Sequence, residues 1–219
     1  MLQVQETSTP DLQQLIGTVV GATTTARPRY KLPYDEEDVF AAVGKLCVAD
    51  IEGRGQKPNK RAIAPYCRKV AKWLTDDTVK PCLILAGNAG TGKTTLLRSV
   101  NRLFGIVEMY DKKFLSATSL AENFILSPEE SERHFCRGHW CKWLLLDDMG
   151  EEPTDVKEYG NVKSPVIRVI ASRYERMLPM LITTNLKQED ILAKYGERTL
   201  DRLKEIAEWV SFSGESFRK

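Results

Sequence analysis

The chain has 219 residues, of which 42% are hydrophobic and 28% charged, and this predicts one globular domain with a substantial buried core. Its 32 basic and 30 acidic residues nearly balance, so a basic face for nucleic acid would have to be local rather than global. The sequence excludes a membrane-spanning or oxidised secreted protein and favours the cytoplasm, because it lacks a long apolar stretch, a signal-peptide pattern and framework spacing of its five cysteines.

The N-terminal part of the chain predicts little regular structure. Residues 1–34 are expected to be a weakly structured segment. Residues 23–34, with two prolines, three threonines and few apolar residues, are typical of an extended linker. The rest of the chain, residues 35–219, is expected to form one domain.

Two helices are predicted before the first strand. Apolar residues recur at helical spacing over residues 35–51, and the acidic residues at the start of this segment favour the positive end of the helix dipole. A second helix is predicted from near residue 64 to residue 74, with Pro65 in its first turn. Its outer face is basic and consists of Arg68, Lys69 and Lys72. We interpret this face as solvated surface, with single-stranded DNA binding as the alternative.

The segment G-x-x-x-x-G-K-T at residues 87–94 follows an apolar run and precedes a helical pattern. Its glycines let the backbone bend around a phosphate chain with N–H groups pointing inward. Lys93 supplies a positive charge for the β- and γ-phosphates, and the Thr94 hydroxyl can ligate Mg²⁺. We therefore predict binding of a nucleoside triphosphate. The predicted contacts are Gly87, Asn88, Ala89, Gly90, Thr91, Gly92, Lys93, Thr94 and Thr95.

Strands and helices alternate along the rest of the chain. Apolar runs predict strands at residues 113–117, 143–146 and 180–183. Helices are predicted over residues 119–126, over residues 127–137 and from Ser164 onward. This alternation predicts an α/β fold, a P-loop three-layer sandwich in which helices cover both faces of a parallel sheet.

Two of the predicted strands end in polar residues that suit phosphate chemistry. Asp147 is expected to hold Mg²⁺ through its water shell, and Asp148 to act as the base for the attacking water. An ordinary acidic turn is the alternative for this pair. Asn185 follows the strand at residues 180–183 and is expected to bind the γ-phosphate or the attacking water, because carboxyl ends of the strands face the nucleotide.

Three segments in this order, LLLDDMG, SRYERMLPMLITTNL and TLDRLKEIAEWVSFSGESFR, resemble the bacterial helicase-loader and transposition-helper branch of the AAA+ ATPases (DnaC/IstB-like). The resemblance covers about residues 60–219. It implies ATP and Mg²⁺ as ligands, Asp147 and Asp148 as the Walker B acids, and Asn185 as the sensor-1 residue. It also implies an AAA+ sandwich of roughly five parallel strands without a C-terminal lid domain.

The resemblance further implies a nucleotide-dependent homo-oligomer. In such an assembly Arg202 would be the arginine finger, which reaches the γ-phosphate bound by a neighbouring subunit and stabilises the charge of the transition state. Arg198 is a competing assignment. An ion pair between Arg202 and Glu205 on the same helix is the structural alternative.

The expected function is ATP hydrolysis coupled to loading or remodelling of a replicative DNA helicase. A helper of a transposase would use the same site, and the sequence does not separate the two. A nucleotide-regulated adaptor with little turnover is a third candidate, since Asp148 stands where many relatives have Glu. A small-molecule kinase is disfavoured because nothing resembles an arginine-rich phosphate lid. Residues 1–34 are too short for a complete helicase-binding domain.

Single-stranded DNA is an expected partner whose contact residues the sequence leaves open. One candidate surface is the basic face described above. The other is the helix that begins near Ser164, which carries Arg168, Arg173 and Arg176. Solvated surface or a subunit contact explains either set equally well.

A histidine and cysteine cluster suggests zinc by its residue types alone. Its members are His134, Cys136, His139 and Cys141. The spacing H-x-C-x₂-H-x-C is tighter than usual and does not join two separated pairs. We therefore expect packing and loop residues here rather than a zinc site.

Overall fold

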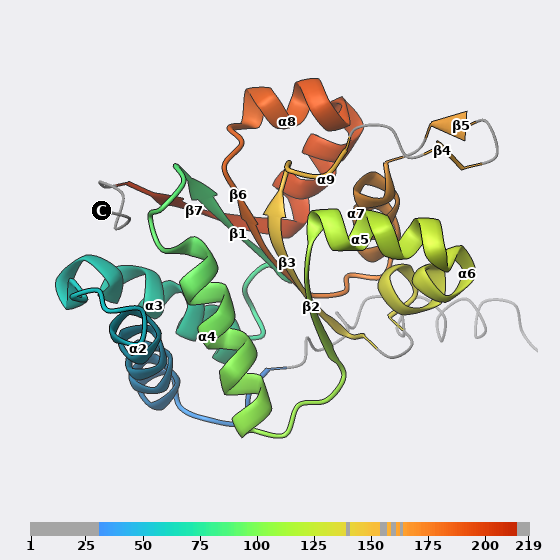
Figure 1. Ribbon diagram of the computed structural model, residues 1–219. Coiled ribbons are helices and arrows are strands. Elements are labelled where there is room, and N and C mark those ends of the chain that lie inside the picture. Colours follow the sequence, from blue (N-terminus) through green and yellow to red (C-terminus); the bar gives the residue numbers. More distant parts are fainter. Residues whose placement is uncertain (1–30, 139–140, 154–156, 159–160, 163, 214–219) are drawn as a thin grey trace, which may run out of the picture. The chain divides into compact units, whose positions relative to one another are not determined.

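The computed structural model describes residues 31–138, 141–153, 157–158, 161–162 and 164–213 (Figure 1). The chain divides into two units, residues 1–30 and residues 31–219, and all described residues belong to the second. The N-terminal segment predicted to be weakly structured lies outside the described residues apart from its last four. There Leu32 is buried, and its N–H donates to the Leu74 carbonyl at 2.8 Å. A domain boundary at residue 34 stays a prediction.

A five-stranded sheet forms the centre of the described domain, and every pairing in it is parallel. In spatial order its strands are β2 (Lys112–Ser116), β3 (Trp143–Met149), β6 (Met180–Thr184), β1 (Cys82–Gly87) and β7 (Ala207–Phe212). The predicted α/β class with a parallel sheet is therefore confirmed. Strand β7 was not predicted, because its apolar residues follow those of the preceding helix without an intervening loop.

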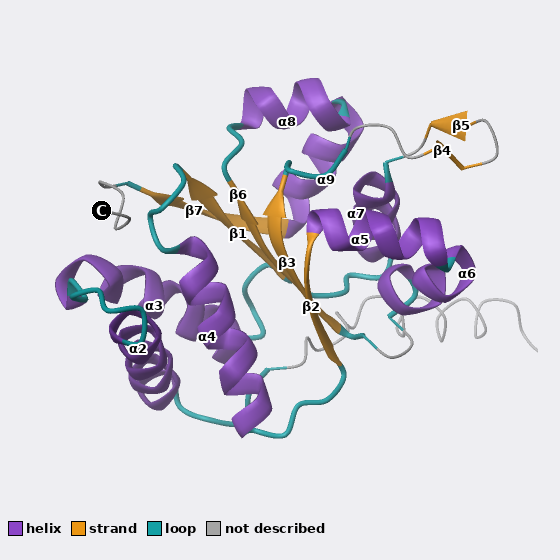
Figure 2. Ribbon diagram, viewed as in Figure 1, coloured by secondary structure: helices purple, strands orange, loops and turns teal. Residues whose placement is uncertain are grey.

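Helices cover both faces of this sheet (Figure 2). One face packs against α3 (Lys60–Thr75) and α4 (Lys93–Ile106), and α2 (Glu36–Glu52) packs against these two helices. The other face packs against α5 (Ala117–Leu126), α7 (Pro165–Glu175), α8 (Gln188–Tyr195) and α9 (Glu197–Ile206). Strand β1 supplies both layers, since Leu83 and Leu85 lie in the first core and Cys82 and Ile84 in the second. This alternation explains why β1 is a continuous apolar run.

Two predicted helices differ from those observed. Helix α3 begins four residues earlier than predicted, because the Asn59 side chain caps it by accepting from Ala62 N at 3.2 Å. Pro65 therefore lies inside the helix rather than in its first turn. The polar helix predicted over residues 127–137 is a short α6 (Pro128–Ser131) followed by a π-helical turn, Glu132–Cys136, whose end is buried.

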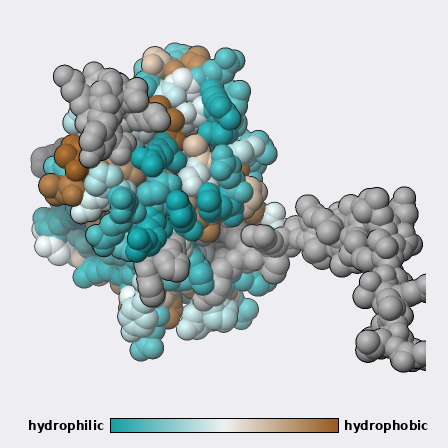
Figure 3. All heavy atoms as spheres, turned by 90° about the vertical axis from the view of Figure 1, so that its right-hand side faces the viewer, coloured by the Kyte–Doolittle hydropathy of each residue, from teal (hydrophilic) through white to brown (hydrophobic). Residues whose placement is uncertain are grey.

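The remaining described strands, β4 (Lys157–Glu158) and β5 (Asn161–Val162), form a separate antiparallel pair. Within the described residues, no helix combines the length and the apolar character needed to cross a membrane. The face on the right-hand side of Figure 1 is largely hydrophilic, with apolar side chains confined to small areas (Figure 3).

Candidate nucleotide-binding site

The predicted phosphate loop lies at the carboxyl end of β1 and leads into α4, which begins at Lys93. Gly87, Gly90 and Gly92 have φ angles of 147°, 82° and 95°, a region that favours glycine. Gly87 has a second constraint, because a Cβ there would lie 2.4 Å from the Phe212 carbonyl oxygen of β7. The conformation of the loop thus requires glycine both for its φ angles and, at Gly87, for the close approach of the neighbouring strand.

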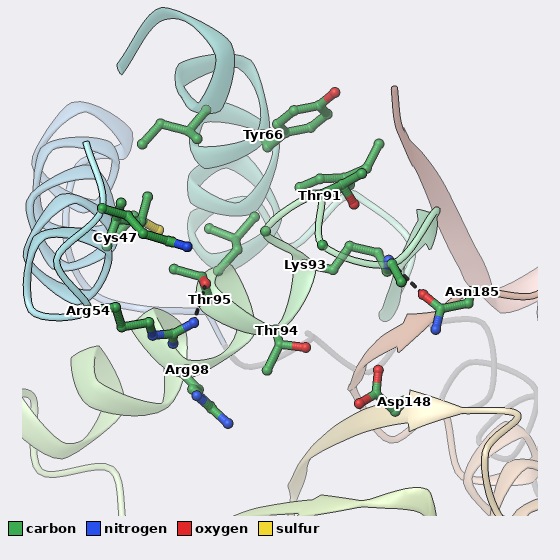
Figure 4. Close-up of a pocket in the computed structure, with 18 of the residues that line it drawn as sticks. Cys47, Arg54, Tyr66, Thr91, Lys93, Thr94, Thr95, Arg98, Asp148 and Asn185 are labelled. Atoms are coloured by element: carbon green, nitrogen blue, oxygen red, sulfur yellow. Dashed lines mark hydrogen bonds between the residues drawn. The ribbon is translucent and has the colours of Figure 1, made fainter. Parts of the chain in front are cut away.

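Lys93 is buried within the loop that it is predicted to serve. Its ammonium group donates to the carbonyls of Gly87 at 2.7 Å and Asn88 at 2.8 Å. It also donates to the Asn185 side-chain oxygen at 2.9 Å (Figure 4). The loop lysine and the predicted γ-phosphate contact, which are 92 positions apart in sequence, therefore meet at one point.

A chain of oxygen atoms joins α4 to β3 and β6. The Thr94 hydroxyl donates to Asp147 Oδ1 at 3.0 Å, and the Thr183 hydroxyl donates to the same oxygen at 2.6 Å. Adjacent hydroxyl and carboxylate oxygens are the hard ligands that Mg²⁺ prefers. Thr94 and Asp147 therefore fit the metal role predicted for them. Thr183 carried no sequence signal beyond its place in a buried strand.

Asp148 lies at an irregular point of β3. Its φ is 54°, a left-handed conformation that is uncommon for a residue with a side chain. The pairing of β3 with β6 shifts register between Leu146 and Met149, and Asp148 N donates to the Thr183 hydroxyl at 2.8 Å. The strand thus bends where the two carboxylates occur, and Asp148 lines the adjacent cavity. Strained backbone of this kind is found most often at functional sites.

The cavity has a volume of about 490 Å³. Loop residues 89–95 line the polar end together with Asp148, Glu151 and Asn185. The rest of the lining includes the less polar residues Cys47, Ile51, Ile63, Tyr66, Cys67 and Phe212, and also Arg54, Gln56 and Arg98. A pocket that combines a small set of polar groups with less polar walls is typical of a small-molecule site.

Several lining residues were missed by reasoning from the sequence. The Tyr66 and Phe212 rings stack with centroids 3.8 Å apart, although they come from α3 and β7. Arg54 follows α2, lines the cavity and donates to the Thr95 hydroxyl at 3.4 Å (Figure 4). None of these residues belongs to a local motif, so only the fold brings them to the loop.

The predicted arginine finger does not line this cavity. Arg202 lies on α9, with its guanidinium 5.3 Å from the centre of the Tyr174 ring and 3.9 Å from a Glu175 oxygen, and its side chain is 15% exposed. Within the described part of the chain its ion pair is therefore with Glu175 of α7 and not with Glu205. Arg198, one turn earlier on α9, is exposed.

Arg173 is wrong as a DNA-contact candidate. The residue is 0% exposed, and its guanidinium donates to the backbone carbonyls of Phe135, Cys141, Lys142 and Pro179. Burial lowers the pKa of Arg173, which reflects the cost of removing its charge from water. Arg168 and Arg68 are partly exposed and form ion pairs, with Glu132 at 2.7 Å and with Glu37 respectively.

The histidine and cysteine cluster is only partly described, because His139 lies outside the described residues. Cys136 and Cys141 are buried, and burial raises the pKa of the Cys136 thiol to about 12. The Cys141 thiol donates to the Trp143 carbonyl at 3.3 Å. Among the described residues no group of three or more potential metal ligands occurs.

Comparison with solved structures identifies the fold. The chain is similar to AMPPCP-bound DnaA from Aquifex aeolicus, with a TM-score of 0.55 and 18% identity over 70% of this chain and 47% of that one. A structure described as a DNA replication initiation factor gives a TM-score of 0.55 at 17% identity, over 70% of this chain and 46% of that one. The chain thus spans about half the length of either. A crystal structure of DnaI gives a TM-score of 0.49 at 18% identity, over 88% of this chain and 91% of that one. A crystal structure of the DnaC helicase loader gives a TM-score of 0.46 at 20% identity, over 60% of this chain and 78% of that one.

No family model matches the sequence, and no curated protein matches it. The structural similarity nevertheless confirms the expected P-loop fold of the AAA+ type. At these identities it establishes the fold and leaves the activity to be argued from the site.

Proposed function

We propose that this chain is an AAA+ ATPase that loads or remodels a replicative DNA helicase. The observation that carries the ATPase part is the convergence of Lys93, Thr94 and Asn185 at the polar end of one cavity, with the buried Asp147 hydrogen-bonded to Thr94. These residues come from the ends of β1, β3 and β6, the edge at which parallel α/β sheets bind ligands.

Each residue has a distinct role in this proposal. Lys93 and the loop N–H groups bind the β- and γ-phosphates. Thr94 and Asp147 hold Mg²⁺, which neutralises charge on the phosphate oxygens. Asp148 accepts a proton from the attacking water, and Asn185 orients that water or the γ-phosphate. The less polar part of the cavity, with the stacked Tyr66 and Phe212 at its wall, accommodates the adenine base.

The replication role rests on two independent likenesses. The ordered motifs around Asp147, Asn185 and Arg202 resemble those of helicase loaders. The fold is similar to that of a replication initiation factor. A transposase helper would share the same site, so co-purification of the full chain with its own helicase or with a transposase distinguishes the two partners.

Replacing Asp148 tests the enzymatic part. Asp148→Asn is expected to keep ATP affinity within about twofold and to lower the rate of phosphate release about 100-fold, because an amide cannot accept the proton of the attacking water. Isothermal titration and a phosphate-release assay measure the two quantities, with Asp38→Asn in the first turn of α2 as an exposed control. Equal turnover in wild type and Asp148→Asn contradicts the role of Asp148. ATP binding without turnover in wild type favours the adaptor.

Replacing Arg202 tests the predicted intersubunit role. Arg202→Ala is expected to retain ATP affinity and to lose the part of the turnover that rises with protein concentration, because a finger acts only on a neighbour. Arg198→Ala on the same helix is the matched control and should keep that dependence. The reverse pattern reassigns the finger to Arg198. A turnover number that is the same at all concentrations of wild type argues against any finger in trans.

A further inference from the structure

The buried carboxylate of Glu152, shortly after Asp148, has no role in the proposal above. Glu152 is 2% exposed, yet it follows Asp148 by only four positions. Its Oε2 accepts from Gly150 N at 2.9 Å, and its Oε1 accepts from the Tyr195 hydroxyl. Burial and the neighbouring Glu152 raise the pKa of Tyr195, so its hydroxyl stays protonated and donates.

Lys194, which precedes Tyr195 at the end of α8, binds the same turn. The Lys194 ammonium donates to the carbonyls of Gly150 and Glu152, the latter at 2.8 Å, and lies 3.7 Å from Glu152 Oε1. Two consecutive residues at the end of α8 thus bind both the side chain and the backbone of the turn. Taking a carboxylate and an ammonium out of water is costly, and these hydrogen bonds offset that cost only in one geometry.

A second set of contacts joins the turn to the segment that carries Asn185. The Thr184 hydroxyl donates to the Met149 carbonyl at 2.7 Å and accepts from Leu186 N at 3.1 Å. At Gly150, where φ is 116°, a Cβ would lie 2.7 Å from a Leu186 methyl carbon. The turn after Asp148 and the segment after Asn185 are therefore in direct contact.

We infer that Glu152 is a positioning residue, which with Lys194 and Tyr195 fixes the turn at residues 148–152 to α8 and so links the γ-phosphate end of the site to that helix. This inference rests on the proposed function, because it assumes a nucleotide at Asp148 and Asn185. The link holds Asp148 in its left-handed conformation. It also makes α8, and α9 which follows it directly, respond to the bound nucleotide.

Hydrogen exchange of the full chain tests the inference without requiring hydrolysis. In wild type, AMPPCP is expected to slow amide exchange both in the loop at residues 87–95 and in α8, each by about tenfold. In Glu152→Ala the loop should still be protected, whereas exchange in α8 should stay within about twofold of its nucleotide-free rate. Glu189→Gln, an exposed position at the start of α8, is the control and should behave as wild type.

Two milder variants keep the test valid if Glu152→Ala does not fold. Glu152→Gln retains an oxygen acceptor for Gly150 N and should preserve more of the α8 response than Glu152→Ala. Tyr195→Phe removes one hydroxyl and should weaken the response while the loop stays protected. Turnover should follow the same order at unchanged ATP affinity, a split that a loss of stability alone does not produce.

Each result bears on a different claim. Loop protection in wild type without an α8 response overturns the link, as does an α8 response that Glu152→Ala and Tyr195→Phe leave intact. Absence of loop protection in wild type overturns nucleotide binding itself, and the inference falls with it.

Discussion

Lys93→Ala is expected to weaken ATP binding by about 100-fold, the loss that follows from removing about 2–3 kcal/mol of charge-assisted hydrogen bonding. Lys93 is buried and its ammonium is already held at the inner surface of the loop by two loop carbonyls and Asn185. Little side-chain entropy is therefore lost when phosphate oxygens join that set. Isothermal titration with ATP and ADP measures the effect.

The controls separate loss of binding from loss of fold. Lys113→Ala, at an exposed position on β2, should leave the affinity unchanged. Thermal unfolding of Lys93→Ala shows whether the variant still folds, because the change removes a buried ammonium group and its three hydrogen bonds. Affinity for ATP that survives in a folded Lys93→Ala variant would overturn the assignment of the site.

Arg173→Met is expected to destabilise the domain by at least about 3 kcal/mol, because it leaves several buried carbonyl groups without a donor. The Arg173 guanidinium donates to the carbonyls of Phe135, Cys141, Lys142 and Pro179. Methionine has a similar length and keeps the apolar part of the packing, so the loss reports mainly the hydrogen bonds. Urea unfolding measures the free energy, and the melting temperature should fall by about 10 °C.

Arg176→Met is the matched control for this change. Arg176 lies three positions further along, is exposed, and donates to the Ser172 hydroxyl at 2.8 Å. Its replacement should alter the free energy of unfolding by less than about 0.5 kcal/mol. If both variants unfold at the same urea concentration as wild type, the hydrogen bonds from Arg173 to the four carbonyls do not contribute to the stability of the domain.

The fold and the polar end of the site were predictable because their signals are local. A buried parallel strand is a continuous apolar run, and the residue at its carboxyl end faces the ligand edge. Asp147, Asp148 and Asn185 each follow such a run, so their positions required no knowledge of long-range contacts. The glycine pattern of the loop is equally local.

Other features depend on contacts that no local pattern encodes. Tyr66 and Phe212 each have ordinary apolar surroundings in sequence, and only the pairing of β7 beside β1 brings them together. Arg173 lies in a segment with Arg168 and Arg176, and its burial depends on the backbone carbonyls of Phe135 and Cys141, which lie 38 and 32 positions earlier. Glu152 follows an acidic turn whose polar sequence predicts exposure to solvent, and its burial depends on contact with α8.

The strand order has a consequence for how the protein is made. Strand β1 lies between β6 and β7, and both of these partners are encoded roughly a hundred residues later in the chain. During translation the phosphate loop therefore leaves the ribosome long before the strands that hold its first glycine and its lysine. The most recognisable motif of the sequence is thus among the last parts of the domain to become structured. A nascent chain halted before residue 207 should accordingly show no affinity for nucleotide.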